Sequence, residues 1–270
     1  MILPVRVVEK VWGRAKLPPP FDAFEREDGE KIGEIWFEPP EQAPELLIKY
    51  LFTSEKLSIQ NHPSDTQTEA KGLGKQGKEE CWLVVAAEEG ATLGIGFREE
   101  LDEAAMREAA LDGSIEDLLV WHPVQVGDFF YIPANTVHAI GPGCSIIEIQ
   151  QNSDITYRLY DYGRPRELHL DEGLAVADGS PYPANLHQRL PEHGHASLVD
   201  GPFFRLDYVD GEAPDGLRYC YPDKALVIPL AGEVLVEGEL LHPGECAYAS
   251  GLADVTFAPE GRALVAAPLG

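Results

Sequence analysis

The sequence predicts a mainly β protein with a small helical insertion and a second, smaller β unit towards its C-terminus. Short apolar or alternating segments recur between turn residues, which is typical of β-sandwiches and barrels. Only one long segment has a strongly helical composition. A stretch from about 161 to 195 is rich in Pro, Gly and charged residues, and short β segments resume after it.

Short strands are expected along most of the chain. Several of the segments alternate between apolar and polar residues, and turn residues such as Gly, Pro and Asn separate them. The first apolar segments, 2–8 and 11–13, precede a rigid loop at Pro18-Pro19-Pro20. The segments that we expect to be strands are 33–38, 45–52, 57–62, 80–85, 92–97, 129–132, 136–140, 145–150, 156–160, 225–230, 232–236 and 246–249.

The helical insertion is expected at about 98–120. Residues 98–111 are rich in Ala, Glu and Leu, and Gly113 follows them where a helix C-terminus favours glycine. Ser114 and Asp117 have the capping-box spacing for a second short helix at 115–120. With a boundary inside the stretch from 161 to 195, we expect one domain over residues 1–175 and another over 176–270.

Composition and charge narrow the classes of function. No run of about 18 apolar residues is present, and the N-terminal segment lacks a signal-peptide core, so a cytoplasmic protein is expected. The formal net charge of −25 repels nucleic acid and anionic membranes, so neither is an expected partner. The 4 cysteines are far apart and form no C-x-x-C motif, which argues against disulfides and a Cys-based zinc site.

Four residues are candidate metal ligands: Gln60, His62, Glu80 and His138. Gln60 and His62 lie two apart in an expected strand, so their side chains share a face. Two nitrogen and two oxygen donors suit zinc with an open position for water or substrate. A single His or Glu is more often a surface or core residue, so the prediction depends on the four together. Glu79 is an alternative to Glu80 and would face the opposite side of the strand.

Residues 127–138 resemble the second sequence motif of the cupin superfamily, a Gly, five residues, Pro, one residue, Gly, two residues and His. Asn135 replaces the second Gly, and Asn is the next-best residue for a left-handed backbone. Segments 57–63, 77–82, 132–141 and 151–158 resemble type I mannose-6-phosphate isomerases of the short bacterial form. The resemblance covers residues 1 to about 165.

The resemblance implies a cupin jelly-roll barrel that holds one Zn²⁺ per chain and interconverts mannose 6-phosphate and fructose 6-phosphate through a cis-enediolate. The Lys-x-Glu spacing of the family selects Glu80, together with Lys78, over Glu79. The implied zinc ligands are Gln60, His62, Glu80 and His138; the implied catalytic residues are Lys78, Arg158 and Asp154; and the implied phosphate-binding residues are Ser58 and Lys49. The expected partner is a small sugar phosphate, and the expected assembly is a monomer or homodimer.

Alternatives stay open for individual residues and for the whole chain. Lys49 could be exposed, Asp154 could cap a turn, and Arg158 could pair with Glu148 or Asp161. The chain could also be a cupin oxygenase with iron at the same ligands, or a cupin that binds a sugar phosphate without catalysis. Residues 244–248 resemble the opening of the cupin motif, but no His follows, so a second, degenerate barrel without metal is expected.

Overall fold

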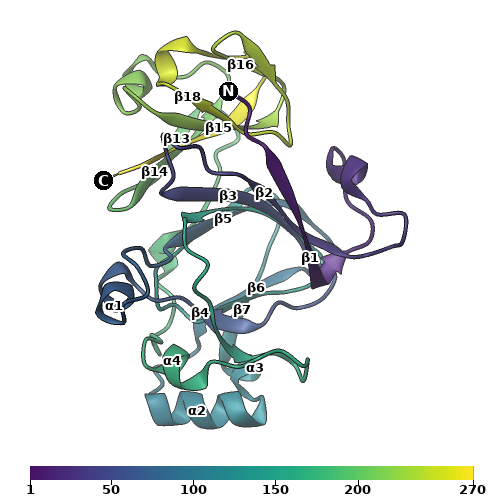
Figure 1. The fold of residues 1–270 in the computed structure, drawn as a ribbon, viewed down its shortest axis with the longest axis vertical. Coiled ribbons are helices and arrows are strands. Elements are labelled where there is room, and N and C mark those ends of the chain that lie inside the picture. The colour runs from purple at the N-terminus through teal and green to yellow at the C-terminus, as the bar shows by residue number, and fades with distance from the viewer. Residues whose placement is uncertain (270) are drawn as a thin grey trace.

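The computed structural model describes residues 1–269 and confirms the mainly β fold class. Twenty strands form four antiparallel sheets, two in the N-terminal part and two in the C-terminal part. The C-terminal sheets pack on one side of the first sheet, and the main helices lie at the opposite end of the molecule (Figure 1). In this described part, no helix is long and apolar enough to cross a membrane.

The N-terminal part consists of two layers that face each other across an apolar core. In spatial order, the first sheet contains β1 (Val5–Arg14), β2 (Ile32–Phe37), β3 (Leu46–Phe52), β10 (Cys144–Gln151), β5 (Glu80–Ala87), β8 (Asp128–Ile132) and β12 (His187–Arg189). The second sheet contains β11 (Tyr157–Tyr160), β4 (Ile59–Asn61), β9 (His138–Ile140), β6 (Thr92–Phe97) and β7 (Leu119–Pro123). Leu51 and Trp82 of the first sheet pack with Leu93 and Ile140 of the second. The layers are separate sheets, as in a double-sheet jelly roll, and they do not share one closed hydrogen-bonded cylinder.

Strand β3 separates two environments because successive side chains point to opposite faces of a sheet. Lys49 and Leu51 line the cavity between the two N-terminal layers. Tyr50 and Phe52 point the other way and join a core that includes Leu226 of the C-terminal part. The first sheet therefore has two buried faces, one towards the candidate site and one towards the C-terminal sheets.

Short helices cover the outer face of the second sheet and its edges. They are α1 (Asp65–Ala70), α2 (Glu103–Asp112), α3 (Ile115–Leu118) and α4 (Leu170–Leu174). Single 3₁₀ turns occur at η1 (Phe21–Phe24), η2 (Ala184–Leu186), η3 (Asp215–Tyr219) and η4 (Leu252–Asp254). Met106 and Ala109 of α2 pack against Ile59 of β4 and Leu159 of β11.

The expected helical insertion is present, but one of its predicted caps is not. Helix α2 begins after Asp102, whose carboxylate accepts a hydrogen bond from the Ala105 amide at 2.8 Å. Gly113 ends it with a left-handed backbone, φ +88°. The capping box predicted at Ser114 is wrong, because Ser114 itself has helical backbone angles and its hydroxyl caps no amide of α3.

The C-terminal part contains two smaller sheets with their own apolar core. One consists of β13 (His195–Asp200), β14 (Phe204–Asp210), β20 (Arg262–Pro268), β15 (Ala225–Ala231) and β18 (Ala247–Ala249). The other consists of β17 (Glu239–Leu241), β16 (Val234–Val236) and β19 (Val255–Phe257). Strand β12 lies beyond residue 175 but pairs with β8 of the first sheet. The domain boundary at 175 stays a prediction.

Candidate metal centre

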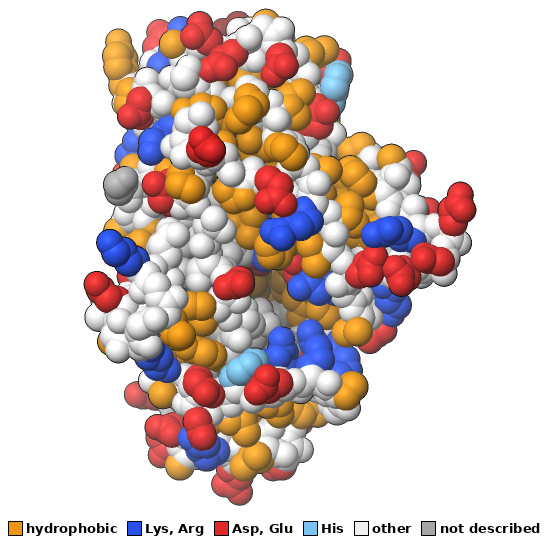
Figure 2. Space-filling view, in the orientation of Figure 1, with side chains coloured by type: hydrophobic (Ala, Val, Ile, Leu, Met, Phe, Trp, Pro, Cys, Tyr) orange, Lys and Arg blue, Asp and Glu red, His pale blue; other side chains and the backbone are white. Residues whose placement is uncertain are grey.

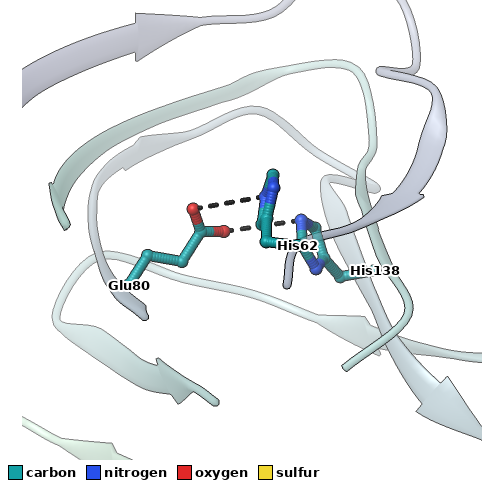
Figure 3. A group of neighbouring side chains, drawn as sticks. All are labelled: His62, Glu80 and His138. Atoms are coloured by element: carbon teal, nitrogen blue, oxygen red, sulfur yellow. Dashed lines mark ion pairs between the residues drawn. The ribbon is translucent and has the colours of Figure 1, made fainter. Parts of the chain in front are cut away.

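Three buried side chains meet in the interior of the N-terminal part. His62 directly follows β4, Glu80 opens β5 and His138 opens β9, so both sheets contribute. The nearest atoms are 3.6 Å apart between His62 Nε2 and Glu80 Oε2, and 3.4 Å apart between His138 Nε2 and Glu80 Oε1. Each of the three residues offers one possible ligand atom, and these atoms lie within 4.8 Å of one another. Figure 3 shows both rings turned towards the carboxylate.

The backbone orients both imidazole rings. His62 Nδ1 lies 2.9 Å from the carbonyl oxygen of Ile155, and His138 Nδ1 lies 2.9 Å from that of Thr136. A carbonyl oxygen can only accept a hydrogen bond, so each Nδ1 carries the proton and donates. Both Nε2 atoms therefore present lone pairs towards Glu80, which is the arrangement found around metal-ligating histidines.

Burial determines the protonation of the three residues, whose exposed fractions are 2% for His62, 1% for Glu80 and 1% for His138. Burial lowers the pKa of His62 well below its usual value, and burial together with the charge of Lys78 lowers that of His138 to about 4. Burial, and next the charge of Glu148, raises the pKa of Glu80 to about 7. The rings are therefore neutral at pH 7, and the contacts between them and Glu80 are not ion pairs.

The donor set fits a divalent cation. Glu80 Oε1 and His138 Nε2 are buried and have no hydrogen-bond partner, although they face each other. Two facing lone pairs in a buried site are unfavourable unless a proton or a cation lies between them. Neutral imidazole nitrogens and a carboxylate oxygen are ligands that Zn²⁺ binds well. The three residues could therefore hold such an ion.

Gln60, the fourth expected ligand, lines the same cavity. Its backbone lies opposite that of His138 in the β4–β9 pair, which explains how an amide and an imidazole from distant segments come together. Its Oε1 accepts a hydrogen bond from Ser58 Oγ at 3.0 Å. Ser58 is buried in the cavity wall, so this hydrogen bond fixes the orientation of both side chains.

Lys78 is the cation nearest to the three residues. Its Nζ contacts Glu80 Oε2, lies 3.2 Å from His62 Nε2 and lies 3.6 Å from Glu148 Oε1. Glu79, the alternative acidic ligand, points elsewhere and accepts a hydrogen bond from Tyr131 Oη at 2.7 Å. The structure thus favours Glu80 over Glu79 at this position.

A buried ion pair forms the wall of the cavity beside Lys78. Lys49 Nζ lies 2.7 Å from Glu148 Oε1, and both residues are buried, so the alternative of an exposed Lys49 is wrong. Burial by itself would raise the pKa of Glu148, but the charges of Lys49 and Lys78 outweigh it and lower that pKa to about 2. Burial alone would lower the pKa of Lys49, but the charges of Glu148 and Glu34 raise it above its usual value. Glu148 therefore carries a negative charge between two lysines.

Glu148 is the residue that the sequence analysis missed as part of the site. It was considered only as a partner of Arg158, and no such ion pair occurs among residues 1–269. The available signal was a lone carboxylate in the apolar segment 144–151, where Glu148 and Gln150 occupy alternate positions. Both side chains line the cavity.

Arg158 and Asp154 lie at the cavity without touching the three-residue centre. Arg158 Nη1 donates to the carbonyl oxygen of Glu167 at 2.6 Å. Its other expected partner, Asp161, pairs with Arg164 and Arg166. Asp154 is exposed and makes no turn-capping hydrogen bond, since the nearby Ile155 amide donates to Ser153 Oγ instead. The structure therefore shows no contact between Asp154 and Lys78.

The cavity has a volume of about 270 Å³, which suits a compact polar ligand. All nine expected site residues except His62 and Glu80 line it, and these two lie directly behind the wall. Figure 2 shows Lys and Arg side chains gathered beside a hollow on the face towards the viewer, at the level of the gap between the two N-terminal layers. In a chain of net charge −25, cations at one hollow favour an anionic ligand.

Comparisons with known proteins support a family assignment. No model of a known protein family matches the chain. The mannose-6-phosphate isomerase of Streptococcus mutans is 42% identical over 171 residues, which are 60% of this chain and 53% of that protein. Mannose-6-phosphate isomerase ManA of Bacillus subtilis is 34% identical over 212 residues, which are 73% of this chain and 65% of that protein. The chain thus matches between about half and two-thirds of the length of these relatives.

The fold agrees with this assignment over nearly the whole chain. The crystal structure of the mannose 6-phosphate isomerase from Bacillus subtilis superposes with a TM-score of 0.78 and 24% identity, covering 98% of each chain. That likeness establishes the fold, and the more similar relatives establish the sequence relationship. The chain is therefore similar in sequence to mannose-6-phosphate isomerases and shares the fold of one of them.

Proposed function

We propose that this chain is a zinc-dependent aldose–ketose isomerase that interconverts mannose 6-phosphate and fructose 6-phosphate through a cis-enediolate. The observation that carries the proposal is the group His62, Glu80 and His138 beside the buried cation Lys78, at a cavity of hexose-phosphate size. The names of the relatives, mannose-6-phosphate isomerases, point to mannose 6-phosphate as a substrate. All of the proposed site residues lie within residues 1–175, which we propose as the catalytic domain.

Zn²⁺ is proposed to be held by His62, Glu80, His138 and Gln60. When bound, the ion would supply positive charge for the sugar oxygens, where negative charge develops during enolisation. The backbone carbonyls behind the two rings keep their Nε2 atoms aimed at this point. Ser58 orients the Gln60 amide through the hydrogen bond to its oxygen.

The isomerisation moves a proton between C2 and C1, and therefore needs an acid/base group beside those carbons. We propose Lys78 for this role because its Nζ reaches the centre of the site and lies beside both Glu80 and Glu148. Arg158 is proposed to stabilise the negatively charged enediolate from the cavity wall, and Asp154 to contact the sugar at the mouth. Lys49 and Ser58 are proposed to meet the phosphate, which needs fixed cations and hydroxyl donors; the Ser58 hydroxyl would then donate to the phosphate instead of to Gln60.

The experiment that tests the proposal measures conversion and proton exchange together. The purified chain is assayed with mannose 6-phosphate as isolated, after removal of metal with a chelator, and after refilling with Zn²⁺. The expected result is formation of fructose 6-phosphate that is lost on chelation and restored by Zn²⁺. In D₂O, deuterium should enter carbon-bound positions at C1 or C2, because the proton passes through an exchangeable group.

Two other outcomes would contradict the proposal, each in favour of an alternative. Binding of mannose 6-phosphate with no deuterium incorporation would identify a sugar-phosphate-binding cupin. Oxygen consumption that depends on Fe²⁺, with no isomerisation under any metal loading, would identify a cupin oxygenase.

A further inference from the structure

A second cavity lies on the opposite face of the sheet that carries Lys49 and Glu80. Its volume is about 500 Å³. We call it the back-face cavity and define it by six of its wall residues: Tyr50, Phe52, Leu83, Ser145, Tyr208 and Leu230. The first four belong to β3, β5 and β10 of the first sheet, and the last two to β14 and β15 of the C-terminal part.

Strand alternation keeps the back-face cavity apart from the catalytic cavity. On β3, Lys49 lines the catalytic cavity and Tyr50 the back-face cavity. On β5, Trp82 and Leu83 divide in the same way. The two cavities share no lining residue, so a ligand in one does not occupy the other.

The walls of the back-face cavity are apolar and aromatic. The ring of Phe21, the first residue of η1, lies 4.5 Å from the ring of Tyr50 and 5.1 Å from that of Phe52. A cavity of this size with apolar walls and a few polar groups has the character of a small-molecule site. The apolar part of a ligand would gain free energy by leaving water for these walls.

A buried polar group inside the cavity has no partner. Ser145 is 1% exposed, and its hydroxyl makes no hydrogen bond with any described residue. On β10 it lies between Phe52 of β3 and Ala86 of β5, on the face away from Glu148. A buried unsatisfied hydroxyl is unfavourable, and a polar atom of a ligand would relieve it.

The rim of the cavity carries two arginines, Arg189 and Arg262, and one carboxylate, Glu192. Both arginines are exposed, and neither forms an ion pair within 4.0 Å with any of residues 1–269. Arg189 donates only to the carbonyl oxygen of Val126, at 3.4 Å. Acidic residues outnumber basic ones 46 to 21 in this chain, so two cations without a carboxylate partner at an apolar cavity favour an anionic head group.

We propose that the back-face cavity binds an amphiphilic organic carboxylate. Its apolar body lies between the Phe21, Tyr50 and Phe52 rings and Leu230, and its carboxylate meets Arg262 and Arg189 at the rim. The chemical class is a medium-chain acyl or aryl carboxylate, which combines a body for the apolar walls with a single charge for the arginines. The site is separate from the proposed isomerase reaction and stands whether or not that activity is found.

Decanoate is the probe, with decyltrimethylammonium as a cation of similar length. Isothermal titration calorimetry on the full, zinc-loaded chain should show saturable binding of one decanoate and none of the cation. Arg262→Glu should weaken decanoate binding at least about tenfold, because a charge-assisted contact is worth about 1.5–3 kcal/mol. Arg218→Glu, an exposed arginine outside the cavity, is the matched control and should leave the affinity unchanged.

Leu230→Trp, which fills the cavity, should abolish binding while circular dichroism shows an intact fold. If that variant does not fold, Val126→Trp narrows the same cavity from an exposed position and should weaken binding. Excess mannose 6-phosphate should not displace decanoate, because the two cavities share no residue. Absence of saturable binding, equal affinity in Arg262→Glu and Arg218→Glu, or displacement by the sugar phosphate would each overturn the proposal.

Discussion

At the scale of single residues, the site is built from groups that the interior tolerates poorly unless they are paired. His62, Glu80 and His138 are buried, yet Glu80 Oε1 and His138 Nε2 have no hydrogen-bond partner. A bound cation would give both atoms a partner at once, and the backbone carbonyls behind the rings already select the required tautomer. Glu79 is the adjacent residue in the sequence, but its carboxylate accepts a hydrogen bond from the Tyr131 hydroxyl and does not face the two histidines.

Glu80→Gln should lower the affinity for Zn²⁺ by at least about 100-fold, because it removes a ligand rather than one of its supporting hydrogen bonds. Competition with a metal-binding dye measures this affinity in solution. Glu79→Gln is the matched control, with the same chemical change one position away, and should bind Zn²⁺ as the unchanged chain does. Equal losses in the two variants would show that the pair is not distinguished by geometry and that Glu80 is not a ligand.

A histidine outside the site links stability to pH. Burial lowers the pKa of His122 below its ordinary value of 6.5, and the charge of His187 acts in the same direction, although a hydrogen bond with the backbone of Ile95 opposes it. The unfolded chain therefore binds a proton at this residue more readily than the folded chain does. By linkage, the contribution of His122 to stability is present above about pH 6.5 and is lost as the pH falls below it.

The His122→Asn variant should therefore lose less stability than the unchanged chain between about pH 7.5 and 5.5. Urea unfolding at several pH values across this range measures the difference in the free energy of unfolding. His242→Asn, at an exposed histidine in the C-terminal part, is the control. Parallel stability curves for His122→Asn and the unchanged chain would contradict the assignment.

At the scale of elements, the strands position the side chains of the candidate site, and short helices cover the second sheet. Lys49 and Glu148 are directly opposite each other in the β3–β10 pair, so sheet register alone brings them together across 99 positions of sequence. Helix α2 seals the outer face of the second sheet beneath β4, which leads to His62. The stability of this helix depends on one N-terminal cap, Asp102, and one left-handed glycine, Gly113.

Asp102→Ala should lower the free energy of unfolding by about 1 kcal/mol, because the Ala105 amide loses its acceptor at the start of α2. Ser114→Ala, at the start of α3, should cost less than about 0.5 kcal/mol, since that hydroxyl caps no helix amide. Chemical denaturation of both variants gives the comparison. A larger loss for Ser114→Ala than for Asp102→Ala would mean that the capping contacts are assigned to the wrong residue.

At the scale of the whole molecule, the net charge of −25 destabilises the compact folded state through repulsion. Basic residues nevertheless gather beside the hollow of the candidate site. Repulsion among surface carboxylates is screened by salt, whereas buried pairs such as Lys49 with Glu148 are screened much less. Repulsion among the surface carboxylates therefore destabilises the folded chain, whereas the charges at the candidate site are paired with one another.

Raising the NaCl concentration from about 0.01 M to about 0.15 M should raise the Tm by roughly 2–4 °C, which corresponds to about 1 kcal/mol for a chain of this size. Differential scanning fluorimetry at fixed zinc loading measures the shift. Sucrose of matched osmolarity separates charge screening from the general effect of excluded solutes. A Tm that is unchanged or lower in salt would show that surface repulsion does not limit stability.

Much of the strand pattern could be predicted from the sequence because period-two alternation is a local property. The segment 92–97 coincides with β6, and most other expected strands differ from the observed ones by one or two residues at their ends. Strands β12 and β13 were not expected, because their short segments have no clear alternation and they pair with β8 and β14, which lie elsewhere in the chain. Strand β14 was not expected either, although its residues largely alternate between apolar and polar. The cap at Ser114 failed because a spacing rule does not specify backbone angles.

The sequence by itself determined the resemblance to mannose-6-phosphate isomerases, the mainly β class and the residue types of the candidate centre: an amide, two imidazoles and one carboxylate at recognisable spacings. Only the tertiary structure decided which atoms face one another, that Glu148 lies between Lys49 and Lys78, and that Asp154 stands apart from them. It alone revealed the cavity on the face of the first sheet away from the candidate metal centre. The physical reason is that alternation and turns are encoded among near neighbours, whereas ion pairs, burial and cavities depend on the register between strands that are far apart in the chain.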